Sequence, residues 1–580
     1  MNVNRKKGVI RKISAVLFTC CVAFVFADNL FVIGAYDIAD TNLFTWISES
    51  LHLNTIRSSW IDSQDAIEKY LMAADKKGIK VILDDVGVDR LARLSRYYYL
   101  WQKVWESDSA YVFHNTGSRV FDGSAFNHYS WKCSVNHHSA GLMQYGPSGW
   151  QAQIQTHYTM PTYIARFRLK IDDEQCCDTV KVCSLIVQSR SDQNITSVVD
   201  TVLRVRDFPR INEYSYFELP FTKSPVDRSA YQYLIWWFGN VDLWSDYIEV
   251  SDDDIGRLTA GLFDDSLKII FSSYKQYPAL SYYYLKDELL YGQFTSNKYL
   301  MHYLREHHSK TPGIQALGGQ GMEHFQLYSD IVKPYVLMFD KYPIRDNTPK
   351  SGPIFQKALD ELCVQLSDMR TVALAETLDF WVIVQAFGRY ESTDRESGGS
   401  ARSWRLPTPE ELHCMTWLGL AYGAKGIFYY CFESRIEDDF YLRGLWRFDH
   451  TPREPLFSEV RKLNQVIESI GPILLTLTSG SVFKSKNIPS HGVINSISPE
   501  CIAQFGTFHD DHSDAYLIVV NRHCHLEYLE KVSFGLDDRY LLIKDIYTNE
   551  VFLPDSATSG STFFSVPFKS GEGRCFKLIP

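Results

Sequence analysis

The sequence predicts an α/β protein: a (β/α)8, or TIM, barrel with an inserted β-sandwich of the jelly-roll type and a second β-sandwich at its C-terminal end. Strand and helix patterns alternate from the start, the alternation stops for one long all-β stretch before it resumes, and the chain ends in short strands. The predicted divisions are a signal peptide at 1–27, barrel at 28–106, inserted sandwich at 107–252, barrel at 253–478 and C-terminal sandwich at 479–580.

The first part of the barrel contains three strand patterns separated by helical ones. Each strand is a short run of apolar and β-favouring residues, which is typical of a strand buried on both faces. The strands are Phe31–Tyr36, Asn54–Trp60 and Ile79–Asp84. The helices extend from the first strand to Leu51, over Asp62–Lys77 with Gly78 as C-cap, and over about Asp89–Trp105.

Between Ser107 and Ser251 the sequence shows no long helical pattern. Short alternating segments separated by turn-rich stretches are typical of a β-sandwich. Two of these segments, TYIARFRLKI and YQYLIWWFGNVDLWSDYIEV, resemble strands of jelly-roll carbohydrate-binding modules. Trp236, Trp237 and Trp244 are candidates for a sugar-stacking platform, although strand spacing places at least one of them in the core.

The strand and helix alternation resumes near Asp253 and supplies five more strands. One of them, LSYYYLKDE at Leu280–Glu288, ends in two adjacent carboxylates. The other strands are Gly313–Leu317, Tyr335–Asp340, Phe380–Phe387 and Gly426–Phe432, and the helices are about Asp253–Tyr277, Asn297–His307, Ile354–Leu374, Pro409–Tyr422 and Leu456–Leu475. Eight strands alternating with helices are what a (β/α)8 barrel requires, and a doubly wound open sheet is the alternative.

Charge and composition exclude some classes of partner. The net charge is −10, and no sustained basic stripe follows the N-terminus, so nucleic-acid binding is not expected. The aromatic content of 14% is high. Aromatic rings fill large cores, and they also stack on the apolar faces of sugars.

The N-terminus carries the features of a signal peptide. Basic residues, among them Lys6, Lys7, Arg11 and Lys12, precede the apolar stretch Ile13–Phe26, which is shorter than the roughly 20 residues of a membrane span. We expect cleavage after Ala27 and a secreted, periplasmic or cell-surface protein, with an uncleaved anchor as the alternative. No later segment has a transmembrane pattern, and the oligomeric state is not predicted.

The cysteines beyond the signal peptide are dispersed and show no CxxC spacing, so the sequence predicts no metal site. Three of them lie in predicted barrel elements and are expected to be buried free thiols: Cys363, Cys414 and Cys431. Four others are close in sequence and are candidates for a disulfide of undefined pairing: Cys133, Cys176, Cys177 and Cys183.

The ends of the predicted barrel strands carry the candidate functional residues. In a (β/α)8 barrel this rim is where catalytic groups lie. The candidates are Tyr36, Arg57, Trp60, Asp84, Asp287, Glu288, Asp340, Tyr342, Gln385, Tyr430 and Glu433. The set is rich in carboxylates, aromatic rings and amides. Glycoside hydrolysis needs two carboxyl groups, and neither a cofactor nor a metal ion.

Four segments resemble barrel glycoside hydrolases of the large retaining clan that includes β-galactosidases and cellulases: YYYLKDEL, VLMFDKYPI, FWVIVQAFG and PTPEELHCMTWLGLAYGAKGIFYY. The resemblance covers the barrel. It implies a glycoside hydrolase that cleaves O-glycosidic bonds of a poly- or oligosaccharide. In that clan the acid/base is a Glu at the end of strand four, commonly preceded by Asn. Glu288 matches this place, with Asp287 in the position of the Asn.

The sequence departs from the clan at strand seven, where Gln385 stands in the place of the nucleophilic Glu. An amide is not a carboxylate nucleophile. The second catalytic carboxyl group is therefore Asp340, Glu433 or Glu391, or else the protein is a non-catalytic glycan-binding protein on a degenerate barrel. A structural or surface-assembly protein is a third hypothesis, and it predicts a plugged barrel mouth.

Eight candidates are assigned to substrate binding rather than catalysis: Asp287, Tyr36, Arg57, Trp60, Asp84, Tyr342, Gln385 and Tyr430. Two of them have structural alternatives. Asp287 is equally suited to capping backbone N–H groups of its loop. Arg57 is equally suited to pairing with Asp84 or Asp85.

Overall fold

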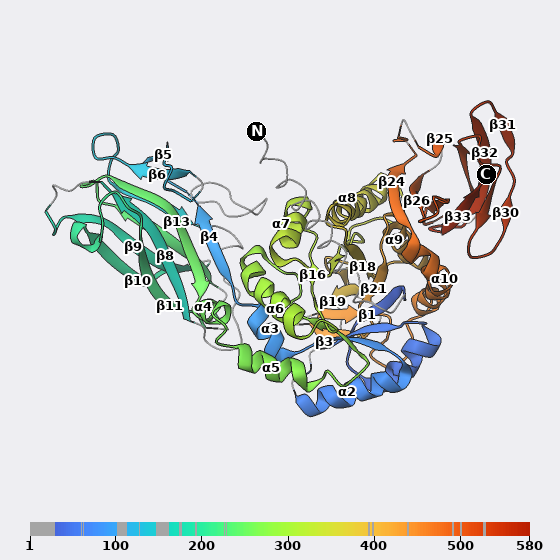
Figure 1. Cartoon of the computed structure of the whole chain (residues 1–580), viewed down its shortest axis with the longest axis horizontal. Coiled ribbons are helices and arrows are strands. Elements are labelled where there is room, and N and C mark those ends of the chain that lie inside the picture. The colour runs from blue at the N-terminus through green and yellow to red at the C-terminus, as the bar shows by residue number, and fades with distance from the viewer. Residues whose placement is uncertain are drawn as a thin grey trace, which may run out of the picture.

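Figure 1 shows a computed structural model of the chain, with the barrel in the centre, the inserted region on the left and the C-terminal region on the right. The structure describes residues 30–59, 61, 63–100, 113–126, 128–146, 162–172, 177–191, 194–224, 227, 229–391, 395–396, 400–437, 440–485, 487–489, 492–498, 502–525 and 529–580, with the backbone alone at 98–100. The predicted signal peptide, Trp60, Cys176 and Cys501 lie outside these residues.

The central sheet is a nearly closed barrel of parallel strands in the order β15-β14-β3-β2-β1-β21-β18-β17-β16. Gln315 separates β15 from β16, so the two ends of this order belong to one interrupted strand. The segments are β1 Val32–Ile38, β2 Thr55–Ser58, β3 Lys80–Asp84, β14 Leu280–Tyr284, β15 Gly313–Ile314, β16 Ala316–Leu317, β17 Val336–Asp340, β18 Asp379–Gln385 and β21 Gly426–Tyr430. The eight predicted barrel strands are thus present, and the open-sheet alternative is wrong.

The barrel is filled with side chains. Strand β14 shows how the pleat produces this: Tyr282 and Tyr284 belong to the inner cluster, while Tyr283 points outward and donates to the Phe271 carbonyl oxygen at 3.2 Å. The other members of the inner cluster include Ile82, Ile314, Met338, Trp381, Ile383 and Phe428. The run of tyrosines is therefore buried on both faces, as predicted.

Helices surround the barrel. Ser63 caps α2 (Gln64–Lys77), and Gly78 ends it in a left-handed conformation with φ of 65°. Thr408 and Glu411 form a capping box at the start of α9 (Pro409–Ala421), the helix predicted at Pro409–Tyr422. The remaining long helices are α6 Phe294–His307, α7 Met322–Val332, α8 Pro353–Glu376 and α10 Leu456–Thr476. Helix α7 had no counterpart in the sequence-based prediction.

Three predicted helices differ in the structure. The first is replaced by two short turns of helix, η1 Thr41–Leu43 and η2 Trp46–Ser50. The helix predicted between Asp253 and Tyr277 is divided into α4 (Asp254–Thr259) and α5 (Asp264–Ser273), because Gly261 between them has φ of 77°.

The helix predicted over Asp89–Trp105 is also wrong. Helix α3 covers only Val86–Ala92, and Arg96–Leu100 forms strand β4. The segment RYYYL has β-favouring tyrosines, and it pairs antiparallel with β13 of the inserted region. Figure 1 shows β4, in blue, running from the barrel to the inserted sheets.

The inserted region consists of two antiparallel sheets with one shared core. Their orders are β10-β9-β12-β7 and β11-β8-β13-β6-β5, and β4 pairs with β13. The strands are β5 Ser118–Phe121, β6 Tyr129–Cys133, β7 Gly141–Gly146, β8 Thr162–Ile171, β9 Lys181–Arg190, β10 Ile195–Arg204, β11 Ser215–Thr222, β12 Ala230–Trp237 and β13 Leu243–Asp252. Trp237 is fully buried in the core, whereas Trp236 is 44% exposed.

The C-terminal region also has two antiparallel sheets, β24-β26-β27-β33-β29-β30 and β25-β28-β32-β31. Its strands are β24 Thr478–Lys484, β25 Ile494–Ile497, β26 Ala503–His509, β27 Ala515–Asn521, β28 Glu530–Leu536, β29 Leu542–Asp545, β30 Val551–Phe552, β31 Ser556–Thr558, β32 Ser561–Phe568 and β33 Gly573–Ile579. A further, four-stranded sheet follows the barrel strands β18 and β21 and contains β19 Gly388–Glu391, β20 Ser400–Ala401, β22 Arg435–Glu437 and β23 Phe440–Arg443.

The described cysteines are free thiols. Cys363, Cys414 and Cys431 are buried, as predicted. Cys133, Cys177 and Cys183 form no disulfide with one another. Among the described residues, no helix is both long and apolar enough to cross a membrane.

Candidate active site

A cavity of about 350 Å³ opens at the rim where the barrel strands end. Its walls include Tyr36 at the end of β1, Asp84 at the end of β3 and Asp287 just beyond β14. Tyr430, at the end of β21, closes another side. The parallel strands therefore bring residues from distant parts of the sequence to one opening, as the barrel topology requires.

Arg57 of β2 lies at the base of this cavity between two carboxylates. Its two terminal nitrogens bond Asp37 and Asp84, and its guanidinium carbon lies 4.5 Å from the centre of the Tyr284 ring. Burial opposes the charge on Arg57, but the two carboxylates outweigh it and raise the pKa above its ordinary value. Both terminal nitrogens are used in these pairs, so the predicted pairing with Asp84 is correct.

The two acids at the end of β3 have different environments. Burial raises the pKa of Asp84 to about 6 against the opposing effect of Arg57. Asp85 caps α3 by accepting from the backbone N–H of Gly87 at 2.8 Å and of Val88 at 3.2 Å. Asp85 therefore has a structural role and is not the partner of Arg57.

Asp287 and Glu288 follow β14 after Leu285 and Lys286, and both are exposed. Asp287 accepts a hydrogen bond from the Tyr284 hydroxyl, and the buried Lys286 donates to the Asp287 carbonyl oxygen. Restricted access of water raises the pKa of Glu288, and the neighbouring Asp287 charge adds to this effect, while Lys286 opposes it.

Asp340, at the end of β17, lies in the same electrostatic cluster. It is 8% exposed, and burial raises its pKa to about 8, with further contributions from Glu288 and Asp287. The Tyr342 hydroxyl donates a hydrogen bond that lowers this pKa in part. Asp340 therefore retains its proton near neutral pH.

Aromatic rings stand beside the carboxyl groups. The rings of Tyr342 and Tyr430 stack with centroids 5.6 Å apart, and Tyr36 meets Tyr430 edge-on at 6.0 Å. Phe387 and Trp404 pack against Tyr342 at 4.9 and 6.2 Å. The rim thus combines acids with flat apolar surfaces, the combination that a pyranose ring requires.

Gln385 lies at the predicted end of strand seven but has no free polar group. It is fully buried, accepts from the Ile344 N–H at 2.9 Å and donates to the carbonyl oxygens of Ile344 and Arg405, both at 3.0 Å. The amide therefore holds the loops that follow β17 and β18.

The two other candidate carboxylates have local partners. Glu433 accepts from the backbone N–H of Ala39 at 2.9 Å and of Asp40 at 3.3 Å, and so fixes the loop after β1. Glu391 is exposed on β19 and pairs with Arg402 at 2.7 Å. Of the three candidates for a second acid, Asp340 is the one whose pKa responds to Glu288.

Several cavity residues were not among the sequence-based candidates. Asp37 lies in β1 and pairs with both Arg57 and Arg435, while Asp89 lies in α3 and Arg93 is the C-cap of that helix. Asp37 is adjacent to a predicted strand end, which is a usable signal. The others lie on helices or loops, where no strand pattern identifies them. Among the described residues, no group of His, Cys, Asp and Glu side chains is arranged to hold a metal ion.

Comparison with known proteins gives only distant structural likenesses. No family model and no curated protein matches the sequence. An α-L-fucosidase of Bacteroides thetaiotaomicron is 9% identical with a TM-score of 0.36, covering 93% of this chain and 80% of that one. A β-L-arabinopyranosidase of Geobacillus stearothermophilus is 14% identical with a TM-score of 0.32, covering 53% and 60%. A β-galactosidase of Bacillus circulans is 9% identical with a TM-score of 0.31, covering 50% and 66%.

These three structures are glycosidases with different substrates. The chain spans 60% of the length of the arabinopyranosidase. At identities of 9 to 14%, neither a substrate nor the role of a residue transfers from them. Any assignment of function therefore depends on the geometry of the rim.

Proposed function

We propose that the protein is a glycoside hydrolase that acts on an oligo- or polysaccharide, with Glu288 as general acid/base and Asp340 as the second catalytic carboxyl group. The observation that supports it is that the pKa values of both groups are raised at the rim of the barrel, and that the Glu288 charge contributes to the shift of Asp340. A raised pKa favours the protonated carboxyl group, the form that donates a proton to a glycosidic oxygen.

The proposed roles follow from the positions of the two groups. Glu288 is exposed at the mouth, where it meets the leaving-group oxygen, and Asp340 is buried deeper beside Tyr342. When Glu288 carries the shared proton, Asp340 no longer faces its negative charge and ionises more easily. The Tyr342 hydroxyl then donates to the Asp340 carboxylate, which attacks the anomeric carbon or activates a water molecule.

The cavity residues fit the binding of a neutral sugar in this proposal. Arg57 and Arg435 are each paired with carboxylates, so the wall offers hydroxyl ligands without a net positive field. Tyr36 and Tyr430 supply aromatic surface in the cavity wall, and Tyr342 stacks on Tyr430. Trp60 remains a predicted contact, whereas the internal bonds of Gln385 remove it from our proposed substrate contacts.

A non-catalytic glycan-binding protein is the second candidate function. It is favoured by one observation, the fully bonded Gln385 in the position where the resembling clan has its nucleophile. In this case the same cavity binds a sugar and leaves it intact.

The deciding experiment is hydrolysis of a panel of aryl glycosides and oligosaccharides by the wild type and by Glu288→Gln and Asp340→Asn. Loss of a general acid/base is expected to lower kcat by about 10²- to 10⁴-fold. Glu391→Gln is the matched control. Glu391 is exposed and pairs with Arg402, so this variant should keep full activity. Unchanged hydrolysis by Glu288→Gln would remove it from the mechanism, and binding without hydrolysis by the wild type would favour the second function.

We also propose that the chain is exported through residues 1–27 and that the two pairs of antiparallel sheets are β-sandwich domains, the inserted one carbohydrate-binding. The basic and apolar N-terminus and the single core shared by each pair of sheets support these proposals. Mass spectrometry of the mature protein, expressed with its own N-terminus, should give a chain that begins at Asp28.

A further inference from the structure

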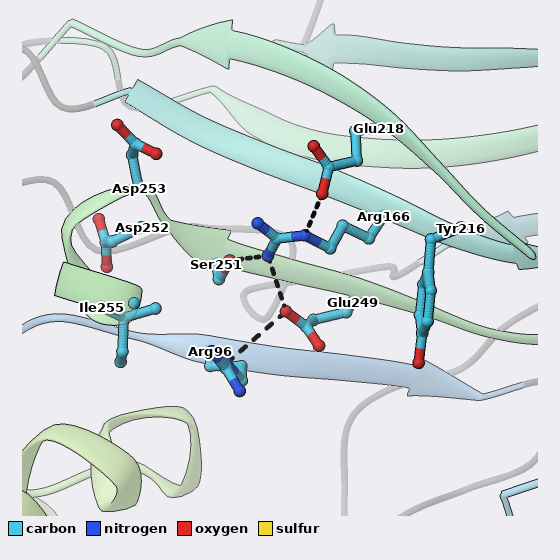
Figure 2. A pocket seen from close by; sticks show the side chains of 10 residues that line it. Arg96, Arg166, Tyr216, Glu218, Glu249, Ser251, Asp252, Asp253 and Ile255 are labelled. Carbon is cyan, nitrogen blue, oxygen red and sulfur yellow. Dashed lines mark hydrogen bonds and ion pairs between the residues drawn. The ribbon is translucent and has the colours of Figure 1, made fainter. Parts of the chain in front are cut away.

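We propose that the inserted region holds a second glycan-binding site, on the outer face of the sheet that contains β11, β8, β13 and β4. Figure 2 shows this pocket, which has a volume of about 320 Å³ and lies where β13 runs into α4. This pocket would be a second binding site of the proposed hydrolase. Only the choice of a glycan as its ligand rests on the proposed function.

The polar wall of the pocket follows from strand register. Arg166 of β8 is directly opposite Glu218 of β11 and Glu249 of β13, and all three side chains point to the same face. The guanidinium donates to Glu218 at 2.6 Å and to Glu249 at 2.9 Å, and it also reaches the Ser251 hydroxyl at 2.8 Å. Arg96 of β4 lies 3.6 Å from Glu249 on its other side.

The β13 side of this network is buried, whereas Glu218 on β11 is exposed. The Glu249 side chain is 10% exposed, Ser251 is 1% exposed and Asp252 is 2% exposed. Charges removed from water are costly unless they are well paired, and their positions are then fixed. The wall therefore presents rigid donors and acceptors that need little reorganisation when a ligand binds.

Tyr216 provides the observation that points to a ligand rather than to sheet stability alone. Its ring stands at the edge of the pocket and is 53% exposed, although its hydroxyl is held by the Tyr247 hydroxyl at 2.8 Å. In Figure 2 the ring stands beside the polar network. A fixed, exposed aromatic face next to directional polar groups matches a sugar ring, which is apolar on its faces and polar at its edge.

The charges of the pocket indicate a neutral ligand. Four carboxylates line it, against two guanidinium groups: Glu218, Glu249, Asp252 and Asp253 against Arg96 and Arg166. The excess of negative charge disfavours an anionic sugar. Each guanidinium near a carboxylate still offers N–H donors and oxygen acceptors to neighbouring hydroxyl groups.

The second pocket is connected to the barrel cavity by a very short stretch of chain. Arg93 lines the barrel cavity, and Arg96 lines the pocket in the inserted region. Three residues span at most about 10 Å. A glycan held in the second pocket is therefore kept near the barrel, which raises its effective concentration there.

Affinity electrophoresis of the full chain carrying Glu288→Gln, in gels containing xylan, galactan, glucomannan or polygalacturonan, tests the proposal. We expect at least one neutral polysaccharide to retard the protein, and Tyr216→Ala to weaken that binding about tenfold, as loss of a central aromatic contact does. Tyr547→Ala, which removes an exposed tyrosine ring from the C-terminal region, is the matched control and should have no effect. The acidic polygalacturonan should not retard the protein.

Three outcomes would overturn the second site: no retardation by any neutral polysaccharide, undiminished binding by Tyr216→Ala, or stronger retardation by polygalacturonan. Unfolding temperatures of the variants check that the fold is intact. Glu218→Gln keeps the shape of an exposed acid and should also weaken binding. A wild-type protein that hydrolyses nothing would overturn the proposed enzyme, whereas this binding measurement would still decide the second site.

Discussion

At the residue scale, two acids at the rim hold backbone conformations that are unusual for residues other than glycine. Asp37 has φ of 62° near the end of β1, and Glu288 has φ of 46° in the loop after β14. Left-handed conformations cost such residues on the order of 1 kcal/mol and are concentrated at functional sites. The turn aims each carboxyl group at the opening, where Asp37 meets Arg57 and Glu288 influences Asp340.

The pKa of Asp340 makes a prediction about stability. Its ordinary value of 3.8 is raised to about 8 in the folded protein, so between these pH values folding takes up a proton. The free energy of unfolding should therefore fall as the pH rises from about 4 to about 8 and then level off. Asp340→Asn removes this loss and should stabilise the protein at pH 8 by at least about 2 kcal/mol while it abolishes hydrolysis.

Urea unfolding at pH 4.5 and at pH 8 measures the effect. The difference between variant and wild type should be small at the lower pH and large at the higher one. Glu391→Gln, which changes an exposed carboxyl group, provides the reference and should show no such dependence. A destabilised Asp340→Asn at pH 8 would contradict the buried, protonated state.

At the element scale, a helix or strand could be predicted from the sequence wherever a local pattern of residues determines it. The run of β-favouring residues in LSYYYLKDE predicts a strand buried on both faces, and the pattern at Pro409–Tyr422 predicts a helix. Both elements are present, as β14 and α9. Prediction failed where contacts with segments distant in the sequence determine the structure of an element or the role of a residue. RYYYL becomes β4 because β13 is available to pair with it, and the role of Gln385 depends on carbonyl groups of loops that follow other elements.

The close approach of β1 and β21 provides an element-scale prediction. A Cβ atom at Gly34 would lie 2.2 Å from the Phe428 ring, which fills the barrel interior. Gly34→Ala should therefore destabilise the protein by about 1–3 kcal/mol in urea unfolding. Gly123→Ala is the control, since a Cβ atom there meets nothing within 4 Å. Adding Phe428→Leu to Gly34→Ala should recover part of the loss, and a failure to do so would place the strain elsewhere.

At the scale of the whole molecule, the barrel is joined to the C-terminal region by close packing and by one buried charge. A Cβ atom at Gly573 of β33 would lie 2.2 Å from Trp417 of α9, so the strand runs directly against the helix. Arg522, after β27, has a side chain that is 2% exposed and pairs with Asp360 of α8 at 2.7 Å. The same carboxylate also binds Lys484 of β24 at 2.8 Å.

Arg522 and Lys484 both pair with Asp360, so they allow a buried and an exposed charge to be compared at the same contact between the barrel and the C-terminal region. Arg522 also donates to the Gln356 carbonyl oxygen at 3.1 Å, so Arg522→Met breaks several bonds in a site that excludes water and should cost about 1–3 kcal/mol. Lys484 is 42% exposed, and Lys484→Met should cost less than about 1 kcal/mol because water replaces the lost contact. In calorimetry, the arginine variant should show an earlier transition for the C-terminal region, followed by that of the barrel. Equal effects of the two substitutions would mean that packing alone, as at Gly573, holds the regions together.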